Sequence, residues 1–211
     1  MRTRVKICGI TRTEDAQLAI DAGADAIGLV FYEKSPRFVS NEQAQEMSQM
    51  IPAFVSKVAL FKDADEQTIQ STLENVEIDL LQFHGSESVE FCEQFTLPYI
   101  KALGMKAAHC DADYLIASAK NYSTAKALLL DGHAPGEAGG TGETFDWSSI
   151  ASIDKPVVLA GGLTAANVKQ AIDMVHPFAV DVSSGVESAP GIKDKSKIAE
   201  FMKQVNSALG R

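Results

Sequence analysis

The sequence predicts a single-domain α/β fold, a (βα)8 or TIM barrel with parallel strands, and three observations predict it. Eight short apolar segments rich in strand-forming residues recur along the chain, and amphipathic helical patterns lie between them. Strands that alternate with helices indicate a parallel sheet, and eight such units suggest that the sheet closes. The length of 211 residues suits one domain and lies near the lower end, ~200 residues, of the usual range for this fold.

The predicted strands are spaced as one strand, one helix and two turns require. They are Arg4–Cys8, Ala26–Phe31, Val55–Phe61, Ile78–Phe83, Tyr99–Leu103, Ala127–Leu130, Val157–Ala160 and Phe178–Val182. An open, doubly wound sheet is the alternative, but the dinucleotide signature GxGxxG is missing after the first strand, where the chain reads Cys8-Gly9-Ile10-Thr11. No linker or low-complexity tract divides the chain, so residues 1–211 are predicted to form one domain.

The predicted helices have apolar stripes and start signals. The clearest stripe lies near the C-terminus and consists of Ile198, Phe201, Met202, Val205 and Leu209. Two capping boxes and one aspartate predict helix starts, at Thr11–Glu14, Ser40–Gln43 and Asp65. A further helix is expected within Asp111–Ser123.

Composition and charge exclude several classes of protein. With 28 acidic and 19 basic residues the formal net charge is -9, so the chain lacks the basic surface that is typical of nucleic-acid binding. No apolar run approaches the ~18 residues of a membrane span, and Lys6 interrupts the short apolar stretch near the N-terminus, so neither a membrane helix nor a signal peptide is predicted. Cys8, Cys92 and Cys110 lack a CxxC spacing, so we expect no disulfide, no zinc site and a cytoplasmic location. No additional apolar element is evident, and we expect a monomer.

Two glycine turns mark a predicted phosphate site. In barrels of this kind the active site lies at the C-terminal ends of the strands. Gly161-Gly162 ends the seventh predicted strand, and Ser184-Gly185 follows the eighth. Glycine lets the backbone approach a ligand closely, and turns on these two neighbouring strands match the recurrent phosphate site of the fold. The alternative is that these glycines only make tight turns.

A third glycine cluster, Gly139–Gly142, follows the sixth predicted strand. It is not a P-loop, because no GxxxxGK[ST] pattern runs through it. We count Gly140 with the phosphate-binding residues and expect the cluster to form a loop that closes over the site.

Titratable side chains at other strand ends are candidate catalytic groups. Asp131 follows an apolar strand, where an unpaired carboxyl group has a raised pKa that suits a general acid; the alternative is a solvated turn residue. Cys8 ends the first strand beside Lys6 and near a helix start, which could lower its pKa enough for it to act; the alternative is a small buried hydrophobe. In a closed ring, strands 7 and 8 lie between strands 6 and 1, so Asp131 and Cys8 would flank the phosphate site.

Two further side chains are candidate ligands of a substrate. Arg37 lies in the loop after the second strand and could hold a carboxylate through two N–H groups, or be a solvated surface residue. His84 lies at a strand end and could line the pocket. The four histidines show no paired metal spacing, so no metal is expected.

Motifs at these strand ends span nearly the whole chain in order. They are Lys6–Gly9, Phe31-Tyr32, Ser35–Val39, Val58–Phe61, Gln82–Gly85, Leu130-Asp131, Gly139–Gly142, Phe145–Trp147, Leu159–Leu163, Asn167-Val168, Asp181–Glu187 and Pro190–Asp194. Together they resemble one family closely, the phosphoribosylanthranilate isomerases of tryptophan biosynthesis. Any one motif is weak, but the combination is highly specific.

The resemblance implies an Amadori rearrangement, an intramolecular oxidoreduction without a cofactor. In this reaction N-(5-phosphoribosyl)anthranilate becomes 1-(2-carboxyphenylamino)-1-deoxyribulose 5-phosphate. The resemblance implies that Asp131 is the general acid that protonates the ribose ring oxygen, and that Cys8 is the general base that removes the C2 proton. It also places Arg37 near the anthranilate carboxylate, Asp181 near the ribose hydroxyls, and the phosphate at the two glycine turns.

Two other functions stay open at this point. The first is a metal-dependent phosphosugar epimerase, whose chemistry usually employs a metal for which the histidine pairs are missing. The second is a non-catalytic phosphometabolite-binding barrel, which would keep the glycine turns and have no need of Cys8 and Asp131.

Overall fold

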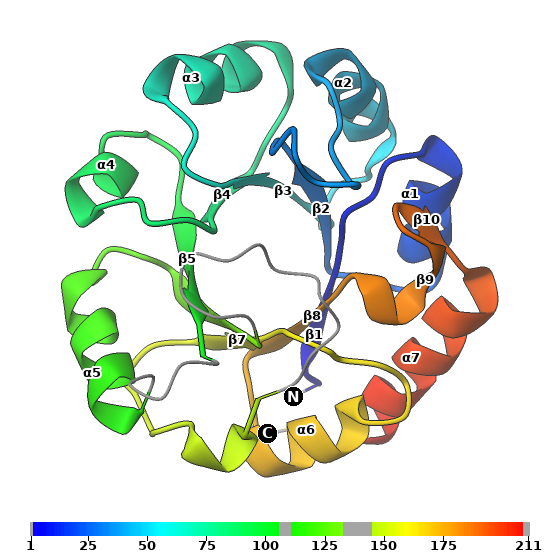
Figure 1. The fold of residues 1–211 in the computed structure, drawn as a ribbon. Coiled ribbons are helices and arrows are strands. Elements are labelled where there is room, and N and C mark those ends of the chain that lie inside the picture. Colours follow the sequence, from blue (N-terminus) through cyan, green and yellow to red (C-terminus); the bar gives the residue numbers. More distant parts are fainter. Residues whose placement is uncertain (1, 106–110, 133–144, 209–211) are drawn as a thin grey trace.

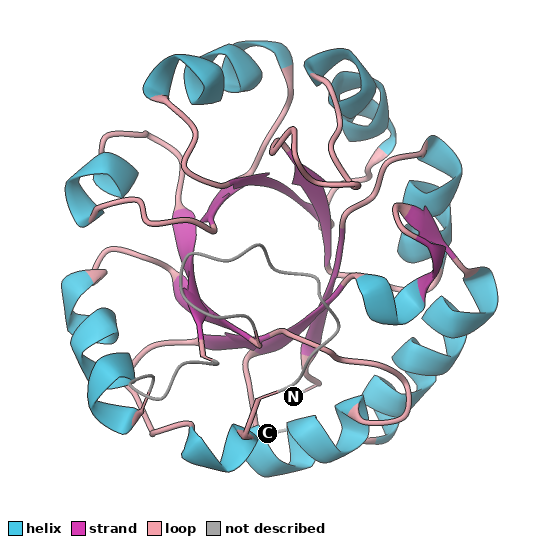
Figure 2. Ribbon diagram, viewed as in Figure 1, coloured by secondary structure: helices cyan, strands magenta, loops and turns pink. Residues whose placement is uncertain are grey.

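The structure, a computed structural model, describes residues 2–105, 111–132 and 145–208. Strands β1 to β8 follow one another around a closed barrel, each parallel to its neighbours, and β8 pairs back to β1 (Figure 1). The helices lie outside the ring of strands (Figure 2). The predicted (βα)8 barrel is therefore confirmed, and the alternative of an open sheet is wrong.

The barrel strands are β1 Arg4–Cys8, β2 Ala26–Val30, β3 Ser56–Phe61, β4 Leu80–Phe83, β5 Tyr99–Gly104, β6 Ala127–Asp131, β7 Val157–Leu159 and β8 Ala179–Val182. The α-helices are α1 Thr13–Asp21, α2 Asn41–Met50, α3 Glu66–Asn75, α4 Val89–Glu93, α5 Ala112–Asn121, α6 Val168–Val175 and α7 Lys195–Ser207. Two 3-10 helices, η1 Trp147–Ser149 and η2 Ser184–Val186, follow β6 and β8. A short hairpin, β9 Glu187–Ala189 and β10 Ile192–Lys193, precedes α7. All eight predicted strands are present, with ends that differ from the prediction by at most two residues.

Side-chain hydrogen bonds cap the starts of two of the three helices for which the sequence predicts a cap. Ser40 and Gln43 form a reciprocal capping box at α2, and Asp65 accepts from the backbone N–H of Thr68 at α3. The predicted box at Thr11–Glu14 is wrong: α1 begins at Thr13 without a side-chain cap. The hydroxyl of Thr11 instead donates to the carbonyl of Gly191, at 2.6 Å, and so ties the hairpin to the end of β1.

Two apolar layers hold the barrel together. Residues that alternate along each strand face either the barrel interior or the surrounding helices. The larger cluster joins the outer faces of the strands to the helices, and Phe83 is fully buried in it, with the ring centroids of Phe95 and Tyr99 at 5.8 and 5.7 Å. A smaller cluster that includes Leu129 and Val158 belongs to the interior. No helix in the described part of the chain is long and apolar enough to cross a membrane.

Two phenylalanines give a matched test of this packing. Phe83→Ala should lower the free energy of unfolding by about 3–5 kcal/mol, because it leaves a cavity among aromatic rings. Phe54→Ala should change it by less than about 0.5 kcal/mol, because the side chain of Phe54 is fully exposed. Urea denaturation of both variants measures the difference, and equal losses would contradict the assignment of the core.

Candidate functional site

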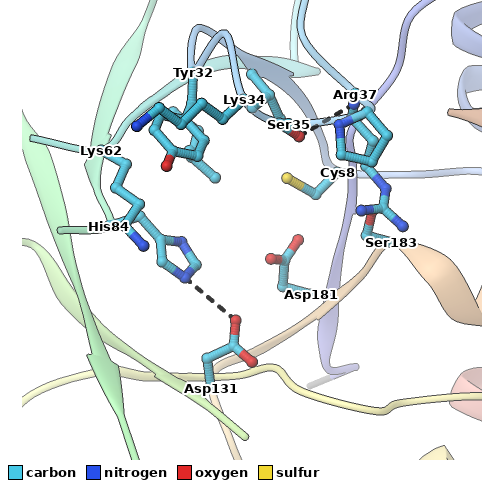
Figure 3. Close-up of a pocket in the computed structure, with 13 residues that line it drawn as sticks. Cys8, Tyr32, Lys34, Ser35, Arg37, Lys62, His84, Asp131, Asp181 and Ser183 are labelled. Carbon is cyan, nitrogen blue, oxygen red and sulfur yellow. Dashed lines mark hydrogen bonds and ion pairs between the residues drawn. The ribbon is translucent and has the colours of Figure 1, made fainter. Parts of the chain in front are cut away.

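The main pocket lies at the C-terminal ends of the barrel strands, where the sequence predicts the active site. Residues from β1, β2, β3, β4, β6 and β8 and from the loops after them line it: Cys8, Val30, Tyr32, Lys34, Ser35, Pro36, Arg37, Leu60, Lys62, His84, Asp131, Asp181 and Ser183. Figure 3 shows the thiol of Cys8 and the carboxylate of Asp181 pointing into this pocket, with Asp131 on the opposite wall. The structure thus brings together all five titratable residues that the sequence singles out.

A smaller cavity adjoins the main pocket on the side of β7 and β8. It is lined by Ala160, Gly161, Gly162, Leu163, Val182 and Ser184, and it shares Asp131, Asp181 and Ser183 with the main pocket. Gly161 and Gly162 both have positive φ angles. No hydrogen bond between described residues uses the backbone N–H of Gly162 or Leu163. These donors are therefore available to an anion.

Gly185 brings the turns after β7 and β8 into contact. A β-carbon on Gly185 would overlap the carbonyl oxygen of Leu163. Glycine is required here because no other residue permits so close an approach of the two backbones. The predicted Gly140 lies outside the described residues, as do the rest of the Gly139–Gly142 cluster and Cys110.

Cys8 is buried between cations and a carboxylate. Burial raises the pKa of its thiol, and the charge of Asp181 raises it further, while Lys6 and Lys193 act in the opposite direction. The expectation of a lowered pKa is therefore wrong in its net direction. The expected contribution of a helix start does not appear among these causes, and α1 begins only at Thr13.

Lys6 forms a buried ion pair with Asp181, at 3.0 Å between Nζ and Oδ1. The two residues are register partners across the β1–β8 seam, so their side chains lie on the same face of the sheet. Burial acts to lower the pKa of Lys6, but the charges of Asp181 and Cys8 outweigh it and raise that pKa. Lys6 is therefore a cation inside the barrel.

Asp131 is paired, which the sequence argument did not foresee. Its Oδ2 lies 3.3 Å from Nε2 of His84 (Figure 3). The amide nitrogen of Gln82 lies 2.9 Å from Nδ1 of His84. With the amide nitrogen of Gln82 as the donor to Nδ1, the proton of a neutral ring lies on Nε2, facing Asp131. Gln82 belongs to the motif Gln82–Gly85 at the end of the fourth strand, but nothing in the sequence marks it as the partner of His84.

Arg37 is held side-on by a carboxylate of the protein itself. Its Nε and Nη2 donate to the two oxygens of Glu187, both at 2.8 Å. Buried Lys193 completes the group: its Nζ donates to Glu187 at 2.7 Å and to the carbonyl of Cys8 at 2.6 Å. Burial works to raise the pKa of Glu187, but Arg37 and Lys193 outweigh it and lower that pKa. A guanidinium has two bidentate edges, so the edge formed by Nη1 and Nη2 remains available to a second carboxylate.

The sequence pointed to Lys6 as a neighbour that could lower the pKa of Cys8, and a lysine two residues before Cys8 in a strand shares its face. Glu187 and Lys193 belong to motifs that carry the family resemblance. No role was predicted for them, because the hairpin that positions them was not predicted. Among the described residues, no group of three or more His, Cys, Asp or Glu side chains is arranged to hold a metal ion.

Comparisons with known proteins show which family the chain resembles. A family model described as N-(5'-phosphoribosyl)anthranilate (PRA) isomerase matches residues 5–204. The N-(5'-phosphoribosyl)anthranilate isomerase of Pseudomonas syringae pv. tomato is 53% identical over 204 residues, which cover 96% of this chain and 97% of that protein. The crystal structure of phosphoribosyl anthranilate isomerase from Thermotoga maritima superposes with a TM-score of 0.84 at 39% identity, covering 97% of this chain and 98% of that one.

A further solved structure, at 38% identity and a TM-score of 0.80, covers 97% of this chain and 98% of that one. It is phosphoribosyl anthranilate isomerase in complex with reduced 1-(o-carboxyphenylamino)-1-deoxyribulose 5-phosphate. The family model spans nearly the whole chain, and the relative from Pseudomonas syringae is well above 30% identical. The chain belongs to the N-(5'-phosphoribosyl)anthranilate isomerase family.

Proposed function

We propose that this protein converts N-(5-phosphoribosyl)anthranilate into 1-(2-carboxyphenylamino)-1-deoxyribulose 5-phosphate in tryptophan biosynthesis, with Asp131 as general acid and Cys8 as general base. One observation carries the proposal: Cys8 and Asp131 lie on opposite walls of one pocket, which adjoins a cavity lined by the glycine turns after β7 and β8. A substrate whose phosphate is anchored in that cavity would present its ribose to both groups.

The reaction balances without an external oxidant or reductant. The carboxyl group of Asp131 gives its proton to the ring oxygen of the ribose, the bond between C1 and this oxygen breaks, and a Schiff base forms. The thiolate of Cys8 then takes the proton from C2, which gives an enolamine. Tautomerisation to the ketone leaves C1 reduced and C2 oxidised, so the electrons move only within the substrate.

His84 supports the role of Asp131. A general acid must be protonated before the reaction, and a carboxylate that has given up its proton needs a hydrogen-bond donor. Nε2 of His84 lies 3.3 Å from Oδ2 of Asp131, and we propose that it donates to this oxygen when the carboxylate forms. This contact stabilises the ionised carboxylate that forms as the ring opens, where the charge develops.

Arg37 and the glycine turns would hold the two ends of the substrate. The Nη1–Nη2 edge of Arg37 suits the carboxylate of the anthranilate, since its other edge is occupied by Glu187. The backbone N–H groups of Gly162 and Leu163 suit the phosphate, and Ser184, Gly185 and the loop residue Gly140 are proposed to contribute to the same site. Asp181 is proposed to face the ribose hydroxyls. A cytoplasmic location and a monomeric state remain predictions.

A coupled assay tests the function. Anthranilate, a phosphoribosyl donor and the upstream transferase generate the labile substrate, and its fluorescence is followed with and without this protein, in EDTA and without it. We expect accelerated loss of fluorescence in both conditions. Absence of acceleration would refute the isomerase, whereas acceleration that EDTA abolishes would favour the metal-dependent alternative.

Two variants test the catalytic roles. Cys8→Ser and Asp131→Asn should each lower turnover by about 10²–10⁴-fold, since a single general acid or base contributes that much. Binding of the reduced product analogue, measured by calorimetry, should stay within a few fold in both variants. A twofold loss of turnover in either variant would remove that residue from the mechanism.

The raised pKa of Cys8 predicts the pH dependence. The active form needs Cys8 as thiolate and Asp131 protonated at the same time, so kcat/KM should follow a bell-shaped pH profile, and the raised pKa of Cys8 should place its alkaline limb above the usual range of a thiol. The measurement is kcat/KM between pH 6 and 10, with circular dichroism to check folding at each value. A fall in kcat/KM that begins below the ordinary pKa of a thiol, about 8.5, would contradict the role of a buried thiol with a raised pKa as the base.

Gly185→Ala tests the proposed phosphate site. The added β-carbon overlaps the carbonyl of Leu163, so the two turns must move apart and affinity for the product analogue should fall at least tenfold. Gly23→Ala is the matched control, because φ is +90° there and the nearest atom, on Met202, is 3.9 Å from the added carbon. The control should lose stability through backbone strain at its positive φ but keep its affinity. Equal affinities in the two variants would contradict phosphate binding at Gly185.

A further inference from the structure

We propose that Lys6 is the counter-ion of the Cys8 thiolate, and that Asp181 competes with Cys8 for this cation. The inference rests on the proposed function, because it explains how a buried thiol can serve as the base. It concerns a positioning residue that acts through Cys8, with no contact to the substrate required.

The strand geometry places Lys6 and Cys8 on one face. Residues two apart in a strand point to the same side, and Cys8 points into the pocket, so Lys6 points into the barrel beneath it. Its Nζ reaches Asp181 on β8 at 3.0 Å, and its positive charge also acts to lower the pKa of Cys8. One ammonium group thus lies near both a carboxylate and a thiol.

Gly28 leaves the space in which the thiol of Cys8 and the ammonium group of Lys6 approach each other. It is the register partner of Cys8 on β2, so a side chain there would point into the same part of the barrel. A β-carbon on Gly28 would lie 2.7 Å from Sγ of Cys8 and 3.0 Å from Nζ of Lys6. The same missing side chain therefore borders both atoms, which shows that the thiol and the ammonium group are neighbours.

The other cations near the thiol are held by a different carboxylate, Glu187. Lys193 donates to the backbone carbonyl of Cys8 and is neutralised by Glu187, and Arg37 is paired with the same glutamate. Neighbouring β2 contributes Gly28 and Val30, which carry no charge. Across the pocket lie Lys62, His84 and Asp131, and His84 is paired with Asp131.

Competition between two anions for one cation has a directional consequence. Loss of the cation leaves Cys8 facing a buried carboxylate, which disfavours the thiolate. Loss of the carboxylate leaves the cation to Cys8 alone, which favours the thiolate. The two substitutions of one ion pair therefore shift the ionisation of Cys8 in opposite directions, whereas a merely structural ion pair would not produce this pattern.

The experiment measures alkylation of Cys8 by iodoacetamide against pH, with the modified peptide quantified by mass spectrometry. We expect Lys6→Met to move the midpoint of this profile upward by at least one pH unit, and Asp181→Asn to move it downward. Lys6→Arg, which keeps the charge, should restore at least half of the shift. Lys62→Met is the matched control, because it removes a cation from the same pocket whose Nζ lies over the ring of Tyr32, and it should leave the midpoint within about 0.3 units.

Cys92 checks the fold within the same samples. It is a core residue, and burial raises the pKa of its thiol to about 12, so its alkylation at neutral pH reports unfolding. If Lys6→Met does not fold, the downward shift in Asp181→Asn still decides the question. Shifts in the same direction in the two variants, or no shift in Asp181→Asn, would overturn the proposal. These readouts need no turnover, so a protein that behaves as expected but lacks isomerase activity would refute the proposed function and leave the role of Lys6 at Cys8 intact.

Discussion

The buried ion pair between Lys6 and Asp181 is the interaction on which the rest of the site depends. It lies across the seam where the last strand of the barrel meets the first, so the closure of the ring and the assembly of the surroundings of Cys8 are one event. Removing two charges from water costs several kcal/mol for each ion unless their geometry is good and further polar groups surround them. The thiol of Cys8 is one such group, and the barrel interior provides the fixed geometry.

The walls of the pocket consist largely of such pairs. Arg37 is fixed by Glu187, which is itself neutralised by Lys193, and the ring of His84 is oriented by Gln82 toward its carboxylate partner. Arg37 and His84 are therefore each held by a second residue that is not proposed to contact the substrate. Polar groups that are fixed before the reaction need little reorganisation while charge develops, and a largely apolar barrel strengthens their effect.

The sequence predicted the barrel well because its signals are local. Every strand combines an apolar run with a neighbouring turn, and the strand order of a (βα)8 barrel follows the chain, so the ends that carry Cys8 and Asp131 could be placed from sequence alone. The ion pairs of the pocket could not be predicted from the sequence, because they join residues far apart in the chain and depend on how far each side chain extends. The pKa of Cys8 was misjudged for this reason: its sign depends on burial and on Asp181, neither of which a strand-end position reveals. The cap expected at Thr11 failed because its hydroxyl binds a distant carbonyl.

The hairpin β9–β10 carries Lys193, so the surroundings of Cys8 are completed late in synthesis and folding. Lys6 and Cys8 are among the first residues synthesised, but their partners Asp181 and Lys193 follow 175 and 185 positions later. Contacts of such sequence separation form late, after the loop between them has closed. A nascent chain that has already built most of its strands therefore holds its thiol without the charges that surround it in the finished protein. Until the barrel is complete Cys8 is an ordinary exposed thiol, and only the finished barrel buries it and supplies the charges that surround it.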